Sequence, residues 1–169
     1  MANDTTITRF SANEDTSRYT PSPISTQFLK FLGQFADWIE KERDIADVNV
    51  WDPAFSGWLR DAELAQERVT GALSALIKEA PTRPSDKPLK LAAYLVHLTM
   101  CSECPGEVAR FAEIARRKAD HFRMVDDSAT HRRVNAMIRT ALTLFESFVA
   151  LDLVGYAPGD DLDTWAPCP

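Results

Sequence analysis

The chain has 169 residues, of which 45% are hydrophobic and 26% are charged, as is usual for a soluble globular protein of one domain. Its formal net charge of −6 gives no overall attraction to nucleic acid or to anionic membranes, so neither is an expected partner. The cysteine count of three is odd and no apolar leader begins the chain, so we expect a cytoplasmic protein with reduced thiols.

Apolar residues at helical spacing, with proline at the edges of the segments, predict an all-α protein. Residues 1–21 are polar and show no period, so we predict a disordered N-terminal tail. Residues 22–155 form the predicted helical bundle domain, and the acidic residues 156–169 a flexible, extended C-terminal tail. Because short connections place successive helices antiparallel, the predicted architecture is an up-and-down bundle of about five helices.

Capping and breaking residues set the expected helix boundaries. Ser22 and Pro23 begin the first helix, Asp52 caps the second, and Pro88 opens the third. The third segment is apolar on nearly every side, which predicts a place in the middle of the bundle. The five expected helices cover residues 23–47, 53–80, 88–103, 107–125 and 129–153.

The stretch "HLTMCSEC", residues 97–104, is the best candidate for chemistry. On a helix, His97, Cys101 and Cys104 share one face because they are four and three residues apart. One imidazole and two thiolates are zinc ligands that leave one tetrahedral position to fill. We predict His121 as the fourth ligand; Cys168 and His131 are the other options. Zinc is the one cofactor that the sequence suggests.

The longer stretch "HLTMCSECPGEVARF" resembles the segment of zinc-binding anti-sigma factors that carries an H-x-x-x-C-x-x-C motif. The resemblance covers these fifteen residues, and Ala72 stands where that family usually has a further histidine. In that family the motif belongs to a small helical domain that clamps a sigma factor, and thiol oxidation releases zinc and partner in some members. The resemblance therefore implies zinc and regulation through a protein partner.

Two other interpretations of the cysteines stay open. A thiol-redox enzyme would use Cys104 as the attacking thiol and Cys101 as the resolving one. Helical proteins resembling alkyl hydroperoxidase D add a histidine to this pair, at the position where Val108 stands here. The third interpretation is a structural bundle with inert cysteines, because cysteine often packs as a small hydrophobic residue. No other catalytic constellation is visible.

Charge and tryptophan placement add to the expected binding role. Residues 107–139 hold eight Arg or Lys against five Asp or Glu, so the rest of the chain is strongly acidic. Trp38 and Trp58 are expected in the core, and Trp51 and Trp165 at the surface, where tryptophan often anchors a partner. We therefore predict a regulatory or adaptor protein that acts by protein–protein interaction, with a zinc or thiol site as its switch. Homo-oligomerisation stays open.

Overall fold

The computed structural model describes residues 20–46, 48–49, 51–102, 104–125 and 128–155, and within them it contains helices and no strands. This confirms the predicted all-α bundle of five helices. The predicted tails lie almost wholly outside the described residues. The elements are α1 (Pro23–Ala46), α2 (Phe55–Lys78), α3 (Asp86–Met100), α4 (Pro105–Arg117), the short 3-10 helix η1 (Ala119–Phe122) and α5 (Ala129–Gly155).

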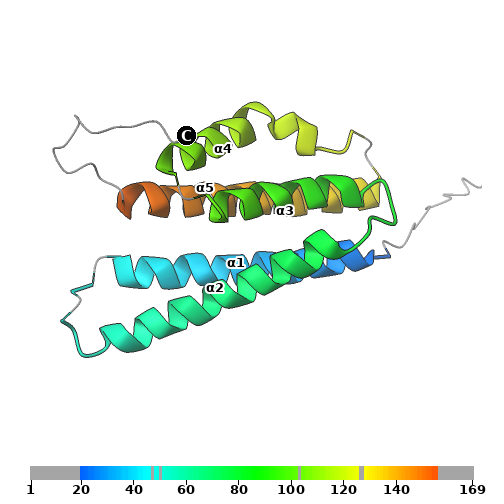
Figure 1. Ribbon diagram of the computed structural model, residues 1–169. Helices are drawn as coiled ribbons and strands as arrows, with labels where there is room; N and C mark the ends of the chain where they lie inside the picture. Colours follow the sequence, from blue (N-terminus) through cyan, green and yellow to red (C-terminus); the bar gives the residue numbers. More distant parts are fainter. Residues whose placement is uncertain (1–19, 47, 50, 103, 126–127, 156–169) are drawn as a thin grey trace, which may run out of the picture.

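The helices run alternately up and down, as expected for short connections (Figure 1). The antiparallel hairpin of α1 and α2 forms one layer, and α3 and α5 form the next. Helix α4 lies outside this four-helix arrangement and packs on both α3 and α5. One result of the alternation is that α1, α3 and α5 all run in the same direction.

An aromatic row on α1 occupies the centre of the core. Phe28, Phe31, Phe35 and Trp38 recur every three or four residues, so they share one face of the helix. The Phe31 and Phe35 rings stack with centroids 5.4 Å apart, and Phe148 of α5 approaches Trp38 at 5.2 Å. This row fixes α1 as the helix around which α2, α3 and α5 pack.

The helix starts agree with the sequence at α1 and α5 and shift by two residues at α2, α3 and α4. Ser22 caps α1 as predicted, because its Oγ accepts a hydrogen bond from the Ser25 amide at 3.0 Å. Asp52 accepts from the Ala54 amide at 2.8 Å and forms a turn just before α2, which begins at Phe55. Helix α3 begins at Asp86, two residues before Pro88.

Asp86, the first residue of α3, joins two distant parts of the chain. The residue is 1% exposed, and one of its carboxylate oxygens accepts a hydrogen bond from the Ser22 hydroxyl. The other oxygen accepts from the amides of Thr82 and Arg83, both at 2.9 Å, and from the Thr82 hydroxyl. The carboxylate therefore holds the start of α1 against the α2–α3 connection.

Lys90 makes a second link between α2 and α3. Its ammonium donates hydrogen bonds to the carbonyl oxygens of Ile77 and Glu79, at 2.9 and 2.7 Å. These carbonyls lie at the C-terminal end of α2, where the partial negative charge of the helix favours a cation. Lys90, a charged residue on the largely apolar helix α3, thus caps the C-terminal end of α2.

Helix α3 is central but not covered on every side, which corrects the prediction. It contacts α1, α2, α4, α5 and η1. Its outer face nevertheless exposes Leu91, Tyr94 and Leu98, with exposed fractions of 40 to 50%. The physical reason is that α4 crosses over α3 and α5 and leaves the side of α3 between α2 and α4 open.

Candidate functional site

Two of the predicted metal ligands lie together at the end of α3. His97 is half-buried on its last turn, and Cys101, which is exposed and has a free thiol, follows the helix. The Cys101 sulfur is 3.8 Å from Nδ1 and 3.9 Å from Nε2 of His97. In a tetrahedral zinc site a sulfur and a nitrogen ligand are about 3.5 Å apart. The pair is therefore close to the spacing that a shared zinc ion needs.

Cys104 lies beyond the end of α3, as the N-cap residue of α4, and it is disulfide-bonded. This differs from the expectation of reduced thiols. An odd number of cysteines excludes complete pairing, yet it leaves room for one bond. A disulfide sulfur does not supply the thiolate that zinc requires, so Cys104 in this state cannot complete the ligand set. Cys168, one option for the fourth ligand, lies outside the described residues.

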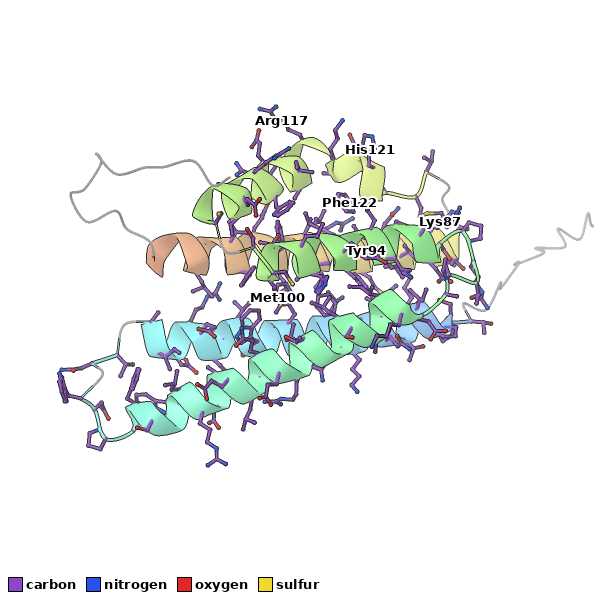
Figure 2. All side chains as sticks on the ribbon, viewed as in Figure 1. Lys87, Tyr94, Met100, Arg117, His121 and Phe122 are labelled. Carbon is purple, nitrogen blue, oxygen red and sulfur yellow. The ribbon has the colours of Figure 1, made fainter. Side chains whose placement is uncertain are left out.

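His121, the predicted fourth ligand, does not lie near His97 and Cys101. It belongs to η1, which contacts α3, and Figure 2 places it at the opposite end of α4 from Met100. The 13 residues of α4 separate it from Cys104 by about 20 Å, because each helical residue adds about 1.5 Å. The bend at Pro105 turns the chain, but the continuous helix then carries His121 away.

His131, the remaining option, lies in the first turns of α5. Among the described residues, no group of three or more His, Cys, Asp or Glu side chains gathers where a metal ion could sit. Of the predicted ligands His97, Cys101, Cys104 and His121, the structure thus brings the side chains of His97 and Cys101 together. Cys104 follows three residues after Cys101 along the chain, and His121 lies elsewhere.

A second feature, which we call the α1/α5 groove, opens between two helices that are distant in sequence. Its cavity volume is about 480 Å³, and most of its lining side chains are apolar. Leu29 is 40% exposed at one end of the groove. The lining residues are Leu29, Leu32, Gly33 and Ala36 from α1, and Arg133, Ala136, Met137, Thr140 and Leu144 from α5.

The groove follows from helix direction and side-chain size. Helices α1 and α5 run in parallel (Figure 1), and the lining residues of each recur at three- and four-residue spacing, so they form two matching edges. Gly33, Ala36 and Ala136 are small and leave the floor low between the larger side chains. A Cβ atom added at Gly33 would meet no atom within 4 Å. Helix α4 covers the neighbouring α3 and α5 face instead.

Within the stretches of α1 and α5 that line the groove, the charged residues are all positive, whereas Asp37 follows directly on α1 and Glu146 on α5. From Pro23 to Ala36, the only charged residue of α1 is Lys30. From Ala129 to Phe145, the helix α5 carries Arg132, Arg133 and Arg139 and no acidic residue. This is unusual in a chain of net charge −6. The positive charge beside the groove forms part of the basic region that the sequence indicates.

The division of the tryptophans between core and surface differs from the expectation at one position. Trp38 is buried and Trp51 is 87% exposed, as predicted. Trp58, expected in the core, is 41% exposed. It lies on the first turns of α2, which project past the end of α3 at Met100 (Figure 1). The apolar stripe of α2 therefore continues beyond the helix that covers its later part.

Within the described residues, the stretch Ala129–Leu151 of α5 is long and apolar enough to cross a membrane by length and composition alone. Val134, Ile138 and Phe145 of this stretch are buried in the core. A core helix of a bundle meets the same criterion, so the stretch does not by itself indicate a membrane protein.

Comparison of the chain with protein-family models, with curated proteins and with solved structures finds no match. Among the described residues, the candidate sites are the His97–Cys101 pair and the α1/α5 groove.

Proposed function

We propose that this protein is a regulatory or adaptor protein that binds a helical segment of another protein in the α1/α5 groove. The observation that carries the proposal is the groove itself, an apolar depression of about 480 Å³ between two parallel helices. Ligand sites in proteins commonly have volumes of about 300–1,000 Å³ and apolar linings. An elongated groove between helices is also a recurrent way to bind an amphipathic helix.

The dimensions of the groove suit a short helix. Its edge on α1 runs from Leu29 to Ala36, and its edge on α5 from Arg133 to Leu144. At about 1.5 Å per residue these edges are about 10 and 16 Å long, or about two to three helical turns. The small residues on the floor allow a helix backbone to approach closely.

The chain itself contains a comparable arrangement on the next face. Helix α4 packs across α3 and α5, and it buries Val108, Ala112 and Ala115, which are spaced by four and three residues. A partner helix with medium-sized or small apolar residues at the same spacing would cover the α1/α5 face in a similar way.

Filling the groove should weaken partner binding strongly without harming the fold. We expect Gly33→Leu to weaken partner binding by about tenfold or more, because the new side chain would occupy the floor on which the partner helix rests. Peptides are first selected from a displayed library of amphipathic helices against the wild-type chain. Their affinities for the wild type and for the variant are then compared by fluorescence anisotropy.

Gly71→Leu is the matched control, because Gly71 is also a helical glycine with no atom within 4 Å of an added Cβ, and it lies on α2 away from the groove. Both variants replace a glycine inside a helix and should keep or raise the melting temperature. Selected peptides that bind Gly33→Leu as tightly as wild type, or a selection that yields no binder, would contradict the proposed function.

A zinc or thiol switch is a second candidate, supported by the 3.8 Å approach of Cys101 to His97. In this proposal, a dithiol reductant gives two electrons and two protons to the Cys104 disulfide and is itself oxidised to a disulfide; the freed Cys104 thiol loses its proton on binding zinc, which then links the end of α3 to the start of α4. Zinc requires deprotonated thiols, so its binding would depend on the redox state. The thiol-redox enzyme stays an alternative for the same two cysteines.

We expect the chain to take up about one zinc ion after reduction and much less before it. The measurement is competition with a chromophoric zinc chelator, on oxidised and reduced protein purified without a histidine tag. Cys101→Ser should lose the zinc uptake of the reduced protein, and His131→Gln should keep it. Equal zinc uptake by Cys101→Ser and wild type would remove this candidate.

A further inference from the structure

We infer that the segment bound in the α1/α5 groove is an acidic amphipathic helix of a partner protein. This inference rests on the proposed function, since it names the chemistry of the partner at the same groove. It goes further because it fixes the sign of the charges on that partner.

The first step is the charge of the two helices. Over the length of the groove, α1 offers Lys30 and α5 offers Arg133 and Arg139, with Arg132 just before them, and these described stretches of the two helices contain no Asp or Glu. Asp37 and Glu40 follow the groove on α1, and Glu146 follows it on α5; Asp37 pairs with Arg68 of α2 at 3.6 Å. A partner with carboxylates beside its apolar stripe would be attracted to this surface, and one with lysines would be repelled.

The second step is the position of Arg133, which is exposed and lines the groove itself. A guanidinium carries several N–H donors in one plane, so it can keep an existing partner and still bind a carboxylate. It lines the same groove as Leu29 and Ala136, so a cation and apolar side chains border one depression. This combination fits a helix whose acidic residues border its apolar stripe.

The third step is the apolar floor of the groove, which favours a protein helix over nucleic acid as the bound partner. None of the described residues that line the groove is aromatic, so these residues offer bases no ring on which to stack. Leu32, Met137 and Leu144 instead offer aliphatic contacts of the kind that leucine and alanine side chains of a helix make. The apolar contacts supply affinity, and the flanking cations select the acidic partner.

The test uses four synthetic peptides of about 18 residues, or about five helical turns. Three share leucine and alanine at positions i, i+3, i+4 and i+7 and carry glutamate, glutamine or lysine elsewhere. The fourth contains the residues of the glutamate peptide in scrambled order, which removes the apolar stripe. Affinities for the full chain are measured by fluorescence anisotropy at about 50 mM and about 500 mM salt.

We expect the glutamate peptide to bind about tenfold more tightly than the glutamine peptide at low salt, and the lysine peptide to bind most weakly. The preference should shrink at high salt, because exposed charges are screened. Arg133→Gln should weaken the glutamate peptide about threefold and leave the glutamine peptide unchanged. Arg60→Gln, a matched change at an exposed position of α2, should alter neither affinity.

Each opposite result has its own meaning. Equal binding of the glutamate and glutamine peptides, lost in Gly33→Leu, would keep the proposed function and overturn this inference. Equal binding of the scrambled peptide would show attraction by charge alone and would also overturn it. If no peptide binds, the proposed function fails as well. If light scattering finds a dimer that Gly33→Leu converts to a monomer, a second copy occupies the groove and the inference is wrong.

Discussion

Replacing Phe35 by alanine is expected to lower the free energy of unfolding by about 4 kcal/mol, within the range of 3–5 kcal/mol typical for buried phenylalanine. Its side chain is fully buried, and its ring lies 5.4 Å from Phe31, 6.1 Å from Trp38 and 5.8 Å from Phe148. The loss combines apolar burial, the aromatic contacts and the cavity that remains. Urea denaturation followed by far-ultraviolet circular dichroism measures it.

Leu29→Ala is the control for this prediction, because Leu29 is on the same helix and is 40% exposed. We expect it to cost less than about 1 kcal/mol. Phe35→Leu keeps much of the volume and should cost clearly less than the alanine change. A loss below about 2 kcal/mol for Phe35→Ala would mean that the aromatic row is not the centre of the core.

Replacing Asp86 by alanine is expected to cost about 3 kcal/mol, although the side chain is small. The change removes both acceptor oxygens and leaves the Ser22 hydroxyl buried without its acceptor, while the Thr82 and Arg83 amides lose theirs. Each unsatisfied buried polar group costs about 1–3 kcal/mol, and water can partly replace the acceptor at the exposed Thr82 and Arg83. The midpoint of urea denaturation checks this value.

Asp86→Asn separates the hydrogen bonds from the charge. Its amide oxygen can still accept from one side, but its nitrogen cannot accept from the amides on the other, so the loss should be about half that of alanine. Asp61→Ala, at an exposed position of α2, should change stability by less than about 0.5 kcal/mol. If Asp86→Ala behaves like Asp61→Ala, the carboxylate does not hold α1 to the α2–α3 connection.

The helices and their direction could be predicted because their signals are local. The aromatic row of α1 repeats every three or four residues, and Ser22 caps the helix three residues before the amide that it accepts from. Asp86 could not be recognised in the same way. An aspartate after "PTRPS" is ordinary in an exposed loop, and its burial depends on Ser22, which lies 64 residues earlier.

The candidate sites divide along the same line. The spacing of His97 and Cys101 is a property of one helix, and the structure places the two side chains together. His121 depended on how α4 continues after Pro105, which a motif does not specify. The α1/α5 groove joins Gly33 to Ala136, about 100 residues apart, so no pattern within either helix indicates it. The one local sign of the groove in the sequence is Gly33, a glycine within the regular helical pattern of α1.

The overhang of the α1–α2 hairpin has a consequence for motion. Residues 55–61 of α2 project past the end of α3, and none of them is buried. Stability varies within a protein, and segments with few buried contacts open locally without unfolding the remainder. The first turns of α2 should therefore fray and re-form while the aromatic row of α1 stays closed, so that Trp51 and Trp58 sample many orientations above a rigid bundle.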